Sequence, residues 1–121
     1  MTPLMLASSK GHFDVVQILL ERHADPLLAD DRTVSGLGRN SLHRAALKGH
    51  AHTVMLLIDW LKLKNKSLDG RDREGCTALL LACENEHWQC AEMLLLNGAN
   101  LDKETTDGRS PRTISLGKHN F

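Results

Sequence analysis

Apolar residues recur along the chain with the spacing of amphipathic helices. Three short runs place apolar side chains three and four residues apart, and they cover residues 15–20, 53–58 and 90–95. A segment rich in leucine, alanine and small polar residues precedes each run. Because apolar positions at this spacing form one face of a helix, the pattern predicts pairs of short helices and an all-α fold.

The segments that precede these runs are copies of one another. They cover residues 2–12, 40–50 and 77–87, and a degenerate fourth copy begins at Ser110. Their starts are separated by 38, 37 and 33 residues. A period of this size is typical of stacked helical repeats, in which each unit contacts only its neighbours.

The copies follow the pattern T-P-L-H-x-A-A-x-x-G-H, as in TPLMLASSKGH at residues 2–12 and NSLHRAALKGH at residues 40–50. The chain therefore resembles the ankyrin-repeat family. The resemblance implies an ankyrin-repeat solenoid of stacked helix-turn-helix units with projecting finger loops, in a single domain over residues 1–121. It also implies a protein–protein interaction scaffold, without identifying the bound protein.

The spacing of the copies also predicts where the repeats begin and end. We expect repeats at about 1–30, 38–71 and 72–104, and a partial repeat at about 105–121. Five surplus residues after the first copy predict an enlarged finger at about 30–38, the internal segment expected to be most mobile. Four surplus residues after the second copy, about one helical turn, contain neither glycine nor proline at 59–64 and predict a longer second helix.

Positive and negative charges balance in this chain. It contains 15 lysines and arginines and 15 aspartates and glutamates. The absence of net positive charge argues against nucleic acid as a general partner. Apolar runs stay far below the roughly 20 residues of a membrane span, and residues 1–20 lack the pattern of a signal peptide. We therefore expect a soluble segment that makes no membrane contact.

The three cysteines favour a reducing compartment. The number of cysteines is odd, and no two of them form a C-x-x-C pair, as the positions Cys76, Cys83 and Cys90 show. Both features argue against a disulfide framework or a zinc site. Cys83 and Cys90 align with small or β-branched residues of the other copies, so we expect them in the core. The chain is expected to be cytoplasmic, and a nuclear location also fits a reducing compartment.

Four of the seven histidines occupy repeated positions. The last position of the pattern, the H of its G-H pair, is occupied by His12, His50 and His87. The histidine of the T-P-L-H pattern is matched by His43. The resemblance implies that these side chains form hydrogen bonds between repeats. No catalytic or phosphate-binding motif is present. We expect no catalytic residue, no cofactor and no metal, and hence no enzyme.

In the resembling family, fingertip residues and the exposed side of the first helices line a concave partner-binding surface. The matching positions here are Arg39, Arg73, Glu74, Cys76, Asp107 and Arg109 in the fingers, and Ser9, Lys10, Leu47, Lys48, Glu84 and Asn85 in the first helices. Arg39, Cys76 and Arg109 share one position of the repeat. Because arginine pairs with carboxylates through two parallel hydrogen bonds, an acidic peptide or helix is the expected ligand. Trp60, in the lengthened helix, is either an exposed anchor for a partner or folded back onto the third repeat.

The apolar positions also predict the core and the ends of the stack. The predicted core leucines are Leu4, Leu19, Leu42, Leu57, Leu79 and Leu94. The end residues expected to be exposed are Met5, Leu6, Phe13, Val16, Ile114, Leu116 and Phe121. Exposed apolar ends are expected if the chain is a segment of a longer array. They are also expected if it is a complete small protein that covers its ends by self-association. The sequence leaves these alternatives open.

Three kinds of function fit this sequence. The first is an interaction scaffold that binds a partner protein in the concave groove. The second is a regulatory or targeting segment of a larger enzyme or channel, and the third is an autonomous short adaptor or inhibitor. All three place the same constraints on these residues, so the sequence does not separate them.

Overall fold

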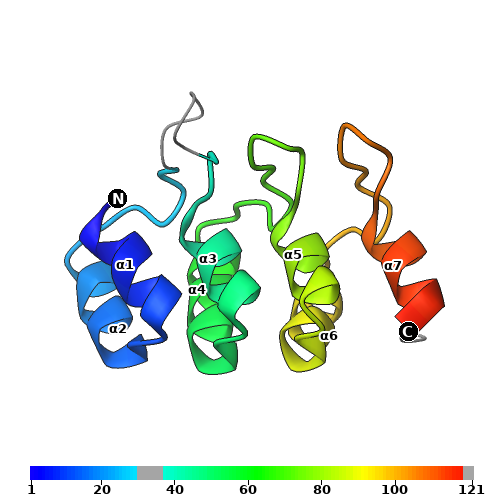
Figure 1. Cartoon of the computed structure of the whole chain (residues 1–121). Helices are drawn as coiled ribbons and strands as arrows, with labels where there is room; N and C mark the ends of the chain where they lie inside the picture. The colour runs from blue at the N-terminus through cyan, green and yellow to red at the C-terminus, as the bar shows by residue number, and fades with distance from the viewer. Residues whose placement is uncertain (30–36, 119–121) are drawn as a thin grey trace.

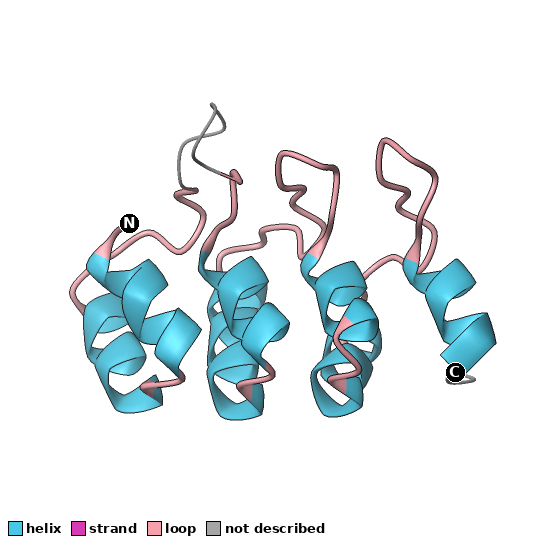
Figure 2. Ribbon diagram, in the orientation of Figure 1, coloured by secondary structure: helices cyan, strands magenta, loops and turns pink. Residues whose placement is uncertain are grey.

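The fold is seen in a computed structural model that describes residues 1–29 and 37–118, with side chains to residue 114. The described residues form helices and no strand. The helices are α1 (Pro3–Lys10), α2 (Phe13–Glu21), α3 (Ser41–Lys48), α4 (Ala51–Leu63), α5 (Ala78–Glu84), α6 (Trp88–Leu96) and α7 (Pro111–Lys118). They pair as α1–α2, α3–α4 and α5–α6, and the pairs stack side by side with the loops projecting on one side (Figures 1 and 2). The predicted all-α solenoid is confirmed.

The first helix of each unit begins at the same polar position of the repeat. Thr2 Oγ1 accepts a hydrogen bond from Met5 N at 3.1 Å, and Thr77 Oγ1 accepts one from Leu80 N at 3.2 Å. In the second unit the cap is Asn40, whose side chain accepts from His43 N at 3.0 Å. Each cap satisfies a backbone donor that the first helical turn leaves unpaired, so these polar residues fix where α1, α3 and α5 begin.

The first two short helices end at glycines that touch the next repeat. Gly11 and Gly49 follow α1 and α3 in the left-handed conformation, with φ of 72° and 75°. A Cβ atom added to Gly49 would lie 2.5 Å from Nδ1 of His87, and one added to Gly11 would lie 2.5 Å from Nδ1 of His50. Glycine is therefore required twice over, by backbone conformation and by the close approach of an imidazole ring.

We expect Gly49→Ala to lower the free energy of unfolding by about 1–3 kcal/mol, because it combines backbone strain with a steric clash. Gly108→Ala is the matched control, since Gly108 has φ of 85° and no atom within 4 Å of an added Cβ. Urea denaturation of both variants measures the difference. The double variant Gly49→Ala, His87→Ala should recover part of the loss, and a Gly49→Ala loss no larger than that of Gly108→Ala would contradict the role of the ring.

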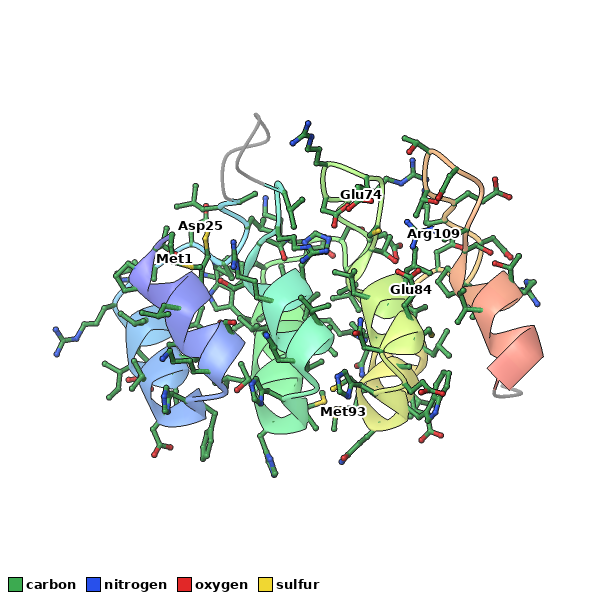
Figure 3. The ribbon with its side chains drawn as sticks, viewed as in Figure 1. Met1, Asp25, Glu74, Glu84, Met93 and Arg109 are labelled. Atoms are coloured by element: carbon green, nitrogen blue, oxygen red, sulfur yellow. The ribbon has the colours of Figure 1, made fainter. Side chains whose placement is uncertain are left out.

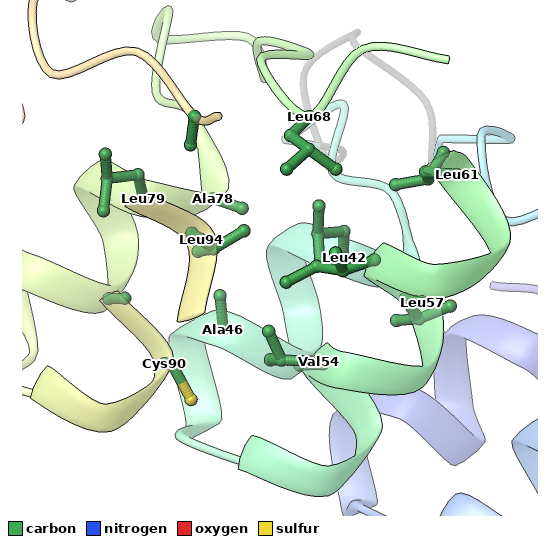
Figure 4. Packing of buried hydrophobic residues seen from close by; sticks show 14 of the residues in the cluster. Leu42, Ala46, Val54, Leu57, Leu61, Leu68, Ala78, Leu79, Cys90 and Leu94 are labelled. Carbon is green, nitrogen blue, oxygen red and sulfur yellow. The ribbon is translucent and has the colours of Figure 1, made fainter. Parts of the chain in front are cut away.

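The main apolar cluster of the core contains residues of all three helix pairs, and Figure 4 shows the part of it where the second and third units meet. Five of the six predicted core leucines are buried, namely Leu4, Leu42, Leu57, Leu79 and Leu94. The prediction for Leu19 is wrong, because its side chain is only partly buried. Leu57 occupies the same position of the repeat on α4, which packs against both α2 and α6, whereas α2 packs against α4 alone among the second helices.

The prediction for the N-terminal end is partly wrong. Leu6 and Phe13 are exposed as expected, but Met5 and Val16 are fully buried. Met5 aligns with His43, a position that faces the following repeat, so the second unit covers it. Ile114 is partly buried against the core, the side chain of Leu116 is among those left undescribed, and Phe121 lies outside the described residues.

Helix α4 confirms the prediction of a longer second helix. It has 13 residues, whereas α2 and α6 have 9 each. The enlarged first finger was predicted at residues 30–38, of which residues 30–36 lie outside the described part of the chain. The prediction of its mobility therefore stays a prediction.

Candidate functional site

The finger loops are joined to one another by the same backbone hydrogen bond. Arg73 N in the second finger donates to Leu37 O in the first at 2.7 Å, and Thr106 N in the third finger donates to Glu74 O at 3.2 Å. The two bonds connect equivalent positions of successive repeats. The described parts of the fingers are therefore joined along one edge of the stack, where they lead into α3, α5 and α7 (Figure 1).

Asp72 organises the second finger from inside. Its Oδ1 atom accepts hydrogen bonds from Glu74 N at 2.9 Å and from Cys76 N at 2.8 Å. Its other oxygen, Oδ2, accepts from Nε of Arg39 at 3.2 Å, which links the end of the first finger to the second. The side chain of Asp72 is buried while that of Arg39 is partly exposed. Arg39 is thus held in place by a structural ion pair.

Arg109 lies in an ion-pair network between the third finger and α5 (Figure 3). Its guanidinium donates to Oε2 of Glu84, and its Nε atom donates to Oδ1 of Asp107 at 3.0 Å. The carboxylate of Asp107, followed by that of Glu84, raises the pKa of Arg109. Hydrogen bonds from Thr105 and Arg109 lower the pKa of Asp107. The charges at this end of the surface are therefore largely paired with each other.

The structure does not place Cys76 at the surface as a groove residue. The residue is buried beside Leu80 and Leu81, and Nη2 of Arg109 lies 4.0 Å from its sulfur. Burial, followed by the charge of Asp72, raises the pKa of its thiol to about 11. Cys76 therefore packs as a small apolar residue beneath the arginine, and its predicted place on the surface of the groove is wrong.

The other predicted residues lie along the fingers and the first helices. The exposed ones are Lys10, Lys48, Arg73, Glu74, Asn85 and Asp107. The partly buried ones are Ser9, Arg39, Leu47, Glu84 and Arg109. The structure brings Glu84, Asp107 and Arg109 into direct contact, whereas Lys10 and Lys48 form no ion pair with any described residue. Their part in partner binding stays a prediction.

Trp60 lies away from this surface, near the C-terminal end of α4. Its ring is partly buried against the core, and Nζ of Lys64 lies 5.9 Å from the ring centroid. The side chain also lines an open groove between α2 and α4. Trp60 therefore faces the first unit of the stack rather than the third repeat, and its part in partner binding stays a prediction.

Two repeated histidines connect neighbouring units as expected. His50 Nε2 lies 2.9 Å from the backbone oxygen of Ser9 in the preceding repeat. His43 Nδ1 accepts from Asn40 N at 3.1 Å, and its Nε2 lies 2.8 Å from Gly70 O and 3.0 Å from Cys76 O. Since Nδ1 accepts, Nε2 carries the proton and donates to the finger carbonyls. Burial is the main cause that lowers the pKa of His43.

The described part of the chain contains no group of three or more histidines, cysteines, aspartates or glutamates arranged to hold a metal ion. Within the same residues, every helix is too short or too polar to cross a membrane.

Asp72 and Thr105 organise the fingers, and neither residue was predicted to do so from the sequence. Both stand four residues before a finger residue whose backbone N–H they accept: Cys76 for Asp72 at 2.8 Å, and Arg109 for Thr105 at 3.0 Å. The signal was available in the sequence, because the two residues occupy one repeat position and both have side-chain oxygens. The groove beside Trp60 was also missed, since its acidic residues come from two different repeats.

Comparison with known proteins places this geometry in a family. A family model for ankyrin repeats, in three copies, matches residues 4–107. An ankyrin repeat and KH domain-containing protein of Caenorhabditis briggsae is 35% identical over 98% of this chain and 4% of its own length. The nuclear factor NF-kappa-B p105 subunit of Mus musculus is 34% identical over 95% of this chain and 11% of its own length.

A third relative is ankyrin repeat domain-containing protein 63 of Homo sapiens, which is 34% identical over 77% of this chain and 23% of its own length. The chain thus spans less than a quarter of each of these relatives. The repeat pattern, the stacked helix pairs and the matched family model agree, and the chain belongs to the ankyrin-repeat family.

Proposed function

We propose that this chain is a protein-binding module whose partner docks on the concave surface formed by the finger loops and helices α1, α3 and α5. Ankyrin repeats are in general protein–protein interaction modules. The finger edge and the first helices offer a continuous surface whose backbone is held by hydrogen bonds between repeats. A surface that is ordered before binding loses less conformational entropy when a partner docks.

The charge of the first helices carries the proposal of an acidic partner. Helix α1 has the sequence PLMLASSK and α3 has the sequence SLHRAALK, so both contain basic residues and neither contains an acid. Lys10 and Lys48 stand at equivalent positions in the last turn, and both are exposed. The acid of α5, Glu84, is already paired with Arg109. Lys10 and Lys48, which form no ion pair with any described residue, place positive charge over the first two repeats, and an acidic peptide or helix complements it.

The double variant Lys10→Glu, Lys48→Glu is expected to weaken partner binding by at least about tenfold, since it places like charges against an acidic ligand. A partner would be recovered by affinity capture with the wild-type chain and its dissociation constant measured by calorimetry. The control is Arg22→Glu, Lys66→Glu, which makes the same change in net charge at exposed sites away from α1 and α3. Equal affinities of all three proteins would reject the concave surface.

Two broader roles rest on the same module. The relatives include a probable E3 ubiquitin-protein ligase of Oryza sativa subsp. japonica, which is 36% identical over 81% of this chain and 18% of its own length. A targeting or regulatory segment of a larger protein is therefore the alternative to an autonomous adaptor. The full-length open reading frame distinguishes the two.

Self-association is a further proposal, supported by the outer face of the first unit. Val15 is 47% exposed, whereas Thr53 and Cys90 at the same repeat position are each 1% exposed. A second copy or another repeat would cover this face, and sedimentation at increasing concentration tests the first of these.

The buried free thiols of Cys83 and Cys90 support a reducing, cytoplasmic location.

A further inference from the structure

A second surface lies between the C-terminal ends of α2 and α4. It is a groove of about 610 Å³, here named the α2–α4 groove, and its lining includes Leu20, Glu21, Asp25, Leu56, Asp59 and Trp60. Asp25, labelled in Figure 3, lies in the loop that follows α2. None of these residues belongs to the concave surface proposed above, so the groove is available to a different ligand.

The groove arises from the difference in length between the two helices. Helix α2 ends at Glu21, and the chain then turns away through His23, which has φ of 69°. Helix α4 continues to Leu63, one turn longer than the second helices of the other units. The last turn of α4 therefore has no partner on the α2 side. Leu63, which also lines the groove, is 82% exposed.

The charges around the groove are mostly negative. Glu21, Asp25 and Asp59 contribute three carboxylates to its lining, against the single ammonium of Lys64 and the imidazole of His23. The C-terminal ends of α2 and α4 also lie at the groove, and the partial negative charge of a helix C-terminus favours cations. A cationic ligand therefore complements the rim, while the side chains of Leu56 and Trp60 offer it apolar contact.

Trp60 already has a cation beside it. Nζ of Lys64 lies 5.9 Å from the centroid of its ring. The indole ring attracts cations through its negative face, and the planar guanidinium of arginine stacks on it better than an ammonium does. Lys64 is exposed and its side chain is flexible, so an incoming arginine is able to displace it from the ring.

We propose that the α2–α4 groove is a second docking site, which binds a segment of a partner protein that carries an arginine or lysine next to an apolar side chain. The cation lies on Trp60 among the three carboxylates. The apolar neighbour packs on Leu56 and Leu63. The chain then holds an acidic segment on its concave side and a basic segment on the side of the second helices.

The test is selection from a display library of random short peptides against the immobilised chain, followed by sequencing. The wild-type chain should enrich peptides with arginine or lysine beside leucine, isoleucine or phenylalanine. These peptides should bind the double variant Glu21→Lys, Asp59→Lys at least about tenfold more weakly. Both substitutions put a lysine near a helix C-terminus, where positive charge is stabilising, so the variant is expected to fold.

Two control variants distinguish binding in the groove from non-specific electrostatic and hydrophobic binding elsewhere on the chain. Leu63→Ser should lose the same peptides, whereas Leu96→Ser should keep them, because Leu96 is 85% exposed at the end of α6 and outside the groove. Glu104→Lys changes an exposed acid away from the groove and should also keep them. Basic peptides that bind the double variant as well as the wild type would overturn the proposal. So would a selection that yields only acidic peptides dependent on Lys10 and Lys48, although that result would support the concave surface.

Discussion

Replacing Leu57 by alanine is expected to lower the free energy of unfolding by about 2–5 kcal/mol, the cost of removing a fully buried leucine side chain and leaving a cavity. Leu57 is 0% exposed and belongs to the continuous core cluster in the central unit. Helix α4 packs against both α2 and α6, so the cavity weakens two interfaces at once. In a short stack whose stability is a sum of unit and interface terms, this is a large share of the total.

Urea denaturation followed by circular dichroism measures this effect. Leu63→Ala is the matched control, because the same chemical change is made on the same helix at a side chain that is 82% exposed. The control should cost less than about 0.5 kcal/mol, as is usual for exposed positions. If both variants unfolded at the same urea concentration, the assignment of the buried face of α4 would be wrong.

Local sequence rules were sufficient for the helices. The apolar spacing and the four surplus residues at 59–64 each act within one repeat, and they predicted the helix pairs and the longer α4 correctly. Hydrogen bonding and side-chain packing at these positions depend on neighbours that are close in sequence. A single sequence therefore contained the information.

The surface could be predicted only in part, because its contacts join residues of different repeats. Cys76 was assigned to the surface from its repeat position, yet it is buried where the side chain of Arg109 lies over it. The pairing of Arg39 with Asp72 crosses 33 positions of sequence, and nothing local indicates it. The α2–α4 groove is lined by Glu21 of the first repeat and Trp60 of the second. Register predicts which side of a helix a residue occupies, but these features depend on how neighbouring fingers and helices meet.

The balanced net charge conceals two surfaces of opposite sign. Lys10 and Lys48 make the side of α1 and α3 basic, while Glu21, Asp25 and Asp59 make the α2–α4 groove acidic. At physiological salt, exposed charges act over about 8 Å, so each surface presents its own sign to a nearby ligand. Zero net charge is thus compatible with electrostatic selection of two different partners.

His43 is the polar residue with the largest expected effect on stability. It is 2% exposed, and its ring joins the N-terminus of α3 to the second finger through Asn40 N, Gly70 O and Cys76 O. His43→Leu removes all three hydrogen bonds. Cys76 O keeps a bond from Asp72 N at 2.9 Å, but Asn40 N and Gly70 O lose their partner. Gly70 is exposed and Asn40 is partly buried, so water can hydrate these two groups in the variant. We expect a loss of about 1–3 kcal/mol in the free energy of unfolding, since each hydrogen bond is worth about 0.5–1.5 kcal/mol net.

The dependence of stability on pH distinguishes this role from simple packing. Burial lowers the pKa of His43 from the ordinary 6.5, opposed in part by Asp72 and assisted by Arg39. The unfolded chain therefore binds a proton at a higher pH than the folded chain, and His43 destabilises the fold as the pH falls below 6.5. The stability difference between wild type and His43→Leu should be full above this pH and should shrink below it. Urea denaturation of both proteins on the two sides of pH 6.5 measures this difference, and a difference that is constant with pH would show that the ring of His43 is not the neutral donor.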